Sequence, residues 1–156
     1  MSFTPSMDQL CGLSLEVAER YGKPHVGAFY AGSGVKTHKR RGDARCAVCG
    51  RPVGSVHHEP PLSRGHVFLL RTKWGQFVLK PSLFALCGSG TTGCHNDFHG
   101  GARFKPYWVW RSDEFAEMWW DGTLLKTIHP HSPELYEYGY WRIHDARTGR
   151  DIEIGR

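Results

Sequence analysis

The residues best suited to chemistry in this sequence are four cysteines arranged as two pairs. Cys46 and Cys49 are separated by two residues, and Cys87 and Cys94 by the six residues Gly-Ser-Gly-Thr-Thr-Gly. Four thiolates satisfy tetrahedral Zn²⁺, and the glycine-rich spacer is flexible enough to fold back and bring Cys94 near Cys87. The odd total of five cysteines, with no secretory signal, argues against a disulfide scaffold. We therefore expect a structural zinc on these four residues rather than a set of reduced, unliganded thiols.

Four histidines lie among these cysteines and have the spacing of a second metal site. His95 and His99 are four positions apart, so on a helix both rings share one face and can ligate one ion. His57 and His58 are adjacent, and in a strand only one of them joins that ion while the other points away. A divalent ion stabilises the charge that develops in phosphodiester hydrolysis, and a neutral imidazole beside it can take a proton from the attacking water.

The pattern of apolar and turn residues predicts the elements that position these side chains. Ser6 to Gln9 is typical of a capping box at the start of a helix over about 6–20, which Gly22 and Pro24 end. The other expected elements are a hairpin over 66–80 with its turn at 73–75, a strand over 82–86, a short helix over about 94–100, a helix after Ser112 that ends at Gly122, and two strands over 136–154.

Between Cys46 and His99, about a third of the chain, the sequence resembles the HNH endonucleases, also called ββα-metal or His-Me finger nucleases. The shared order is a Cys-x-x-Cys knuckle, a histidine doublet followed by Pro-Leu-Ser-basic-Gly, an apolar strand that leads into a cysteine, and Cys-His-x-x-x-His. In this sequence the four parts are Cys46 to Cys49, His57 to Gly65, Leu83 to Cys87, and Cys94 to His99. The implied fold is two antiparallel strands and a helix that clasp one ion, braced by the zinc knuckle.

The resemblance also implies a role for each histidine. His57, His95 and His99 correspond to ligands of the catalytic metal, and His58 corresponds to the general base that activates water. Mg²⁺ and Mn²⁺ are the usual activators of the family, while three imidazoles would also hold Zn²⁺ or Ni²⁺. The asparagine that steadies the loop carrying the base is replaced here by Ser82, whose hydroxyl can make part of the same hydrogen bonds.

Positive charge is concentrated in the first two thirds of the chain. Residues 1–111 carry 15 Lys and Arg against 6 Asp and Glu, a net of +9, and residues 112–156 carry 5 against 9, a net of −4, which sum to the formal +5 of the whole. A basic body suits a polyanionic partner. Lys39, Arg40, Arg41 and Arg64 are the predicted contacts to the phosphate backbone, and the alternative for each is an exposed solubilising charge.

Together these features predict a single α+β domain. An N-terminal helix and basic arm (1–45) precede the HNH catalytic core (46–101), and a C-terminal extension (102–156) supplies a helix and a β-hairpin. Trp108, Trp110 and Trp141 are expected to pack in the core rather than stack on bases. The longest apolar runs are far too short to span a membrane, so no membrane partner is expected.

The predicted function is metal-dependent cleavage of double-stranded DNA, by nicking or by cutting both strands. The alternative is a zinc-braced nucleic-acid-binding module without strong catalysis, and the basic body argues against a structural zinc protein or a hydrolase of another substrate. The absence of a recognisable secretory signal points to the cytoplasm, with a virion or a host-encoded location as the alternative. The resemblance suggests a bacterial or phage-infected cell, with a phage packaging or other DNA-processing protein as a partner.

Overall fold

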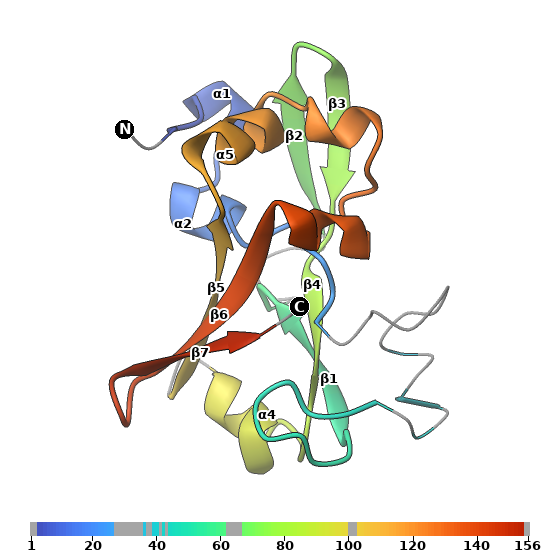
Figure 1. Ribbon diagram of the computed structural model, residues 1–156, viewed down its shortest axis with the longest axis vertical. Helices are drawn as coiled ribbons and strands as arrows, with labels where there is room; N and C mark the ends of the chain where they lie inside the picture. Colours follow the sequence, from blue (N-terminus) through green and yellow to red (C-terminus); the bar gives the residue numbers. More distant parts are fainter. Residues whose placement is uncertain are drawn as a thin grey trace.

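The computed structural model describes residues 3–26, 36, 39–40, 42, 44–61, 67–99 and 103–154. The fold is mixed α+β, as predicted, and the described residues form short helices and three small antiparallel sheets (Figure 1). The helices are α1 (Met7–Leu10), α2 (Leu15–Ala18), α4 (Gly93–Phe98), α5 (Asp113–Trp120) and the 3₁₀ turns η3 (Leu124–Lys126) and η4 (Pro133–Glu137). The strands are β1 (Ser55–Glu59), β2 (Phe68–Thr72), β3 (Gly75–Leu79), β4 (Ser82–Leu86), β5 (Phe104–Trp110), β6 (Gly139–Asp145) and β7 (Arg150–Ile154).

The N-terminal segment forms two helices of four residues, so the prediction of one helix over 6–20 is wrong. The capping box itself is confirmed, because Ser6 and Gln9 exchange side-chain and main-chain hydrogen bonds. Cys11 then adopts a left-handed conformation with φ of 53°, and Gly12 follows at 84°. Ser14 starts α2 by accepting the N–H of Val17. Glycine takes a positive φ at little steric cost, and this break outweighs the helical spacing of the leucines.

Three elements at the lower end of Figure 1 carry the predicted chemistry: β1, β4 and α4. β1 and β4 pair antiparallel with His57 opposite Phe84, and α4 packs against both strands. The strand over 82–86 and the hairpin of β2 and β3 are confirmed. The short helix is confirmed as well, although α4 begins at Gly93 and ends at Phe98, with His99 as its C-cap.

The C-terminal part supplies a three-stranded sheet with the order β5-β6-β7 and the helix α5. Ser112 caps α5 by accepting the N–H of Phe115, as its position before two acidic residues predicted. The two predicted tail strands are β6 and β7, with their turn before Arg150. Within the described residues each helix is too short to cross a membrane, since the longest, α5, has 8 residues.

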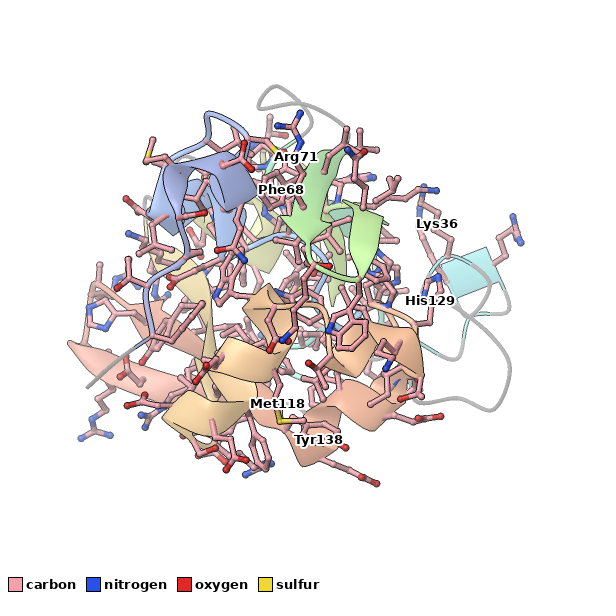
Figure 2. All side chains as sticks on the ribbon, turned by 90° about the horizontal axis from the view of Figure 1, so that it is seen from above. Lys36, Phe68, Arg71, Met118, His129 and Tyr138 are labelled. Atoms are coloured by element: carbon pink, nitrogen blue, oxygen red, sulfur yellow. The ribbon has the colours of Figure 1, made fainter. Side chains whose placement is uncertain are left out.

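Two large clusters of buried side chains form the core. The first joins α1, the hairpin and α5 through residues such as Phe68, Leu70 and Trp119, and Figure 2 labels Met118 and Tyr138, which pack against it. The second joins β4, α4 and β6 around Phe84, Phe98 and Trp141. Trp108 packs against both clusters, which confirms the interpretation of the tryptophans as core residues. The indole N–H of Trp141 donates to the carbonyl of Pro24 at 2.9 Å.

Candidate metal centres

The four predicted zinc ligands meet at one point beside the start of α4. The Sγ atoms of Cys46, Cys49, Cys87 and Cys94 all lie within 4.8 Å of one another. Cys46 and Cys87 are buried, whereas Cys49 is exposed. Four thiols at this spacing can bind a metal such as zinc. Cys11 lies elsewhere, half-buried against the first core cluster.

The wide spacing between Cys87 and Cys94 is closed by a tight loop built on two glycines. Gly88 and Gly93 have positive φ values of 78° and 63°. A Cβ on Gly88 would lie 2.2 Å from the carbonyl oxygen of Thr92, and one on Gly93 would lie 2.8 Å from that of Cys87. Only glycine fits both positions, so the spacer folds back and returns Cys94 to Cys87.

Hydrogen bonds hold the cysteines in place. The main-chain N–H of Cys46 donates to the carbonyl of Arg51 at 2.7 Å, and the N–H of Ala47 donates to Ala85 on β4 at 2.8 Å, which docks the knuckle onto the sheet. The N–H of Cys94 points at the sulfur of Cys87 and lowers the pKa of that thiol. Burial and the surrounding thiols raise the pKa of Cys94, and a divalent cation among the sulfurs would reverse this effect.

The three predicted histidine ligands also meet. His57 comes from β1, His95 from α4, and His99 from the residue that caps α4. One ring nitrogen of each lies within 4.8 Å of the other two. The ring centroids of His57 lie 5.3 Å from His95 and 5.8 Å from His99, and those of His95 and His99 are 4.8 Å apart. The strand and the short helix therefore place their imidazoles around a common point.

A hydrogen-bond relay fixes the tautomer of His95. Ser55 donates its hydroxyl proton to the carbonyl of Gly88 at 2.9 Å, so its oxygen accepts the Nδ1–H of His95, which lies 2.5 Å away. The Nε2 of His95 is then unprotonated and carries the lone pair that a metal needs. Because Gly88 belongs to the loop between Cys87 and Cys94, the relay joins the cysteine cluster to the histidine cluster.

Glu59 fixes the tautomer of His57 in the same way. The Nε2 of His57 lies 3.1 Å from Oε2 of Glu59, and the carboxylate forms an ion pair with Arg20. A hydrogen bond from Nε2–H leaves Nδ1 with its lone pair. Burial, with smaller contributions from the other histidines of the cluster, lowers the pKa of His57 to about 3. His57 is therefore neutral at pH 7, the state in which an imidazole binds metal.

Ser55 and Glu59 were not among the predicted site residues. Both stand two positions from His57 on the same strand, so the alternation of side chains in β1 places all three on one face. The sequence signal that identifies them is this period of two, once the strand itself is recognised.

His58 points away from His57 across β1, as predicted, yet it borders the same cavity. A cavity of about 320 Å³ is lined by the three clustered histidines, by His58, and by Val56, Pro61 and Gly90. His58 is half-buried, whereas His57 is buried. The predicted base therefore lies beside the histidine cluster without belonging to it.

Ser82 is fully buried and lies opposite Glu59 in the strand pair. Its hydroxyl donates to the carbonyl of Lys23 at 2.9 Å and accepts the N–H of Lys23 at 3.2 Å. These hydrogen bonds hold the segment that leads to His25. Residues 62–66 lie outside the described residues, so support of the loop after Glu59 by Ser82 stays a prediction.

The predicted phosphate contacts are only partly described. Lys39 and Arg40 are exposed, as a contact to DNA requires, and Arg41 and Arg64 lie outside the described residues. Lys36, in the same basic arm, lines a second cavity beside His58.

Two further basic residues near α4 are engaged within the protein. Arg103 forms a paired contact with Asp145 at 2.9 and 3.0 Å, and Nζ of Lys105 lies 2.8 Å from Oε1 of Glu16. These ion pairs favour a structural role for both residues.

Comparisons of the chain with protein-family models, with curated proteins and with solved structures found no match. The function of the protein is therefore inferred from the geometry of the two clusters.

Proposed function

We propose that this protein is a metal-dependent endonuclease of the HNH type that hydrolyses phosphodiester bonds of DNA. The observation that carries the proposal is the shared cavity in which three histidines with clustered ring nitrogens lie beside a fourth, His58. In this proposal β1, β4 and α4 form the ββα-metal core, and the four cysteines hold a structural zinc that braces it.

The histidine cluster has the donor chemistry of a catalytic metal site. The hydrogen bonds to Ser55 and Glu59 leave one lone pair on His95 and one on His57, and His99 supplies the third ligand. Three protein ligands leave coordination positions for water and for a phosphate oxygen, as in catalytic metal sites. Imidazoles suit Zn²⁺ and Ni²⁺, while Mg²⁺ and Mn²⁺, which prefer oxygen ligands, are held more weakly. When bound, the ion would stabilise negative charge on the phosphate and on the leaving oxygen.

His58 is the proposed general base. Its ring accepts a proton from a water molecule in the cavity, the water oxygen attacks the phosphorus, and the bond from phosphorus to the 3′ oxygen breaks. Imidazole is the side chain most often used as a general base in proteins. Because side chains alternate along β1, His58 borders the cavity from a different side than the ligand His57.

DNA fits the charge of the chain. The net of +9 over residues 1–111 includes the basic arm, from which Lys36, Lys39 and Arg40 are exposed in the structure. Exposed Lys and Arg side chains neutralise phosphates and release counterions, so binding should weaken as salt rises. A DNA-processing partner, such as phage packaging machinery, belongs to this proposal as the source of sequence or site selection.

Cleavage of supercoiled plasmid tests the proposal. Wild type, His58→Ala and His144→Ala are assayed with EDTA, Mg²⁺, Mn²⁺ or Ni²⁺, and bound zinc is quantified in each protein. His144 is a suitable control because it is exposed on β6 and hydrogen-bonds to Asp151 outside the cavity. Wild type and His144→Ala should nick only with added metal. His58→Ala should keep its zinc and lose about 100-fold or more in rate, the size of a general-base contribution.

Cleavage by His58→Ala at the wild-type rate, or cleavage by wild type in EDTA, contradicts the assignment of the base or of the metal. If none of the three proteins cuts DNA or RNA while all bind DNA equally, the zinc-braced binding module replaces the nuclease.

A further inference from the structure

A second cavity also borders His58. It has a volume of about 330 Å³, and its lining includes His58, His25 and His131 together with the lysines at 36 and 80. His58 thus borders both this cavity and the one that holds the three clustered histidines. A strand laid across His58 would reach from one cavity into the other.

The walls of the second cavity are flat rings and apolar side chains. The rings of His25 and His131 are 4.5 Å apart. His131 donates its Nδ1–H to the carbonyl of Lys23 at 3.0 Å, which fixes its orientation. Pro81 and Leu83 line the same space. Imidazole rings and apolar surfaces of this kind stack against nucleobases.

Both imidazoles of the wall are uncharged at neutral pH. Burial is the largest cause that lowers the pKa of His25 to about 3 and that of His131 to about 4, and the neighbouring His129 lowers both further. The wall therefore offers neutral ring faces, and positive charge comes from elsewhere.

That charge stands at the exposed edge of the cavity. Lys36 and Lys80 are both exposed and both line it. Figure 2 shows Lys36 on the same side of the molecule as His129, which neighbours His131 with ring centroids 5.7 Å apart. A cavity with neutral rings inside and ammonium groups at its edge matches a nucleotide, whose base is flat and whose phosphate is anionic.

We propose that this second cavity binds one nucleotide of the cleaved strand, the one next to the scissile phosphate, with its base out of the stack. The inference rests on the proposed function for the position of the scissile phosphate. The base lies against His25, His131 and Leu83, and the phosphate contacts Lys36 and Lys80. Because unstacking is easiest in single strands and mismatched duplexes, such substrates should be preferred.

Binding of thymidine 5′-monophosphate to the zinc-loaded protein tests this inference, in buffer without other divalent metal so that no cleavage is needed. The imidazole resonances of His25 and His131 are followed by NMR, and dissociation constants are compared with those of thymidine and inorganic phosphate. Lys80→Gln is the test variant and Lys73→Gln, an exposed lysine on the hairpin turn, is its control. His131→Leu tests the ring wall.

The nucleotide should shift both imidazole resonances and bind more tightly than thymidine or phosphate alone. Lys80→Gln should weaken binding about tenfold, the size of one charge-assisted hydrogen bond, and Lys73→Gln should change it less than about twofold. His131→Leu should weaken the binding of the nucleotide and of thymidine to the same extent. The wild-type spectra test the inference even if this last variant does not fold.

The inference is wrong if the nucleotide shifts neither resonance, if both lysine variants weaken binding equally, or if inorganic phosphate binds as tightly as the nucleotide. Plasmid nicking by the same proteins separates the two proposals. If the protein nicks plasmid but does not bind the nucleotide, only the proposal of nucleotide binding in the second cavity is wrong. If it binds the nucleotide but does not nick plasmid, only the endonuclease proposal is wrong.

Discussion

The cysteine cluster and the histidine cluster share the start of α4, yet they differ in how many donors they offer and in what surrounds them. Cys94 and His95 are consecutive residues that serve different clusters. The first cluster combines four thiols, while the second combines three imidazoles and borders a cavity of about 320 Å³. Structural zinc sites are closed by four protein ligands, and catalytic sites keep a position open. One helix turn therefore joins a site suited to bracing and a site suited to chemistry.

The difference also shows how the two sites depend on each other. The relay from Gly88 through Ser55 to His95 starts in the loop that returns Cys94 to Cys87. Loss of a cysteine ligand should therefore also disturb the geometry of the histidine cluster, whereas removal of a histidine should leave zinc binding by the cysteines unchanged.

The largest expected effect is the loss of a cysteine ligand. Cys49→Ser should release the zinc, lower the free energy of unfolding by several kcal/mol and abolish cleavage, because the binding energy of structural zinc, about 10–16 kcal/mol in small peptides, is coupled to folding. Cys49 is exposed, so the substitution removes little packing. Metal analysis and thermal unfolding measure the effect, with Cys11→Ser as the control that should keep its zinc. Full zinc content in Cys49→Ser would contradict the four-cysteine site.

Removal of a histidine ligand should separate activity from stability. His99 is exposed at the end of α4, so His99→Ala should keep its zinc and change the free energy of unfolding by less than about 0.5 kcal/mol. Cleavage should fall by more than about 100-fold, beyond the effect of losing an outer hydrogen bond to a ligand. Plasmid nicking and thermal unfolding are compared on the same sample. A large loss of stability would show that the two clusters are not distinct in role.

Ser55 lies between the two clusters, and its removal should have an intermediate effect. In Ser55→Ala the Nδ1–H of His95 loses its acceptor, so affinity for the activating metal should fall about 10–100-fold while zinc remains bound. The metal concentration that gives half-maximal nicking measures this affinity. Ser89→Ala is the matched control, because Ser89 lies in the same loop and bonds Thr91 and Thr92 instead. If both variants need the same metal concentration for half-maximal nicking, the proposed role of Ser55 in orienting His95 is wrong.

Substitution of Lys23 should have the smallest effect on metal binding and cleavage, because Lys23 belongs to neither cluster. The side chain of Lys23 is fully buried, and its Nζ lies 4.2 Å from the ring centre of Trp119 and 4.3 Å from that of Trp110. This Nζ has no hydrogen-bond partner among the described residues. Lys23→Met should raise the free energy of unfolding by about 1–2 kcal/mol without changing zinc content or nicking.

The contribution of Lys23 to the free energy of unfolding should depend on pH. Burial lowers the pKa of Lys23 well below its ordinary value of 10.5, so between the folded-state pKa and 10.5 the unfolded chain binds more protons than the folded one. Wild-type stability should therefore gain from this residue as pH rises from neutral toward 10.5. Urea unfolding across this range should show a flatter profile in Lys23→Met, and an identical slope in both proteins would contradict the account of Lys23.

The sequence predicts the two donor sets because cysteine and histidine spacing is local and their chemistry is narrow. The alternation of β1 further predicts that His57 and His58 point to different sides, as the structure has them. Other features depend on residues far apart in the chain. The buried lysine between tryptophans and the cavity shared by His25 and His131 arise from packing of distant segments, which no local pattern encodes. The prediction of one helix over 6–20 was wrong because the left-handed conformation of Cys11 interrupts the helix despite the helical spacing of the apolar residues.

A titration with Co²⁺ tests most directly the claim that one centre braces the fold and the other performs catalysis. Metal-free protein receives two equivalents while absorbance and plasmid nicking are followed. The first equivalent should produce the intense near-ultraviolet bands of cobalt bound to thiolate without nicking, and the second should start nicking without adding to those bands. Nicking that rises with the first equivalent, or thiolate bands that grow equally with both, would contradict the division of roles between the cysteines and the histidines.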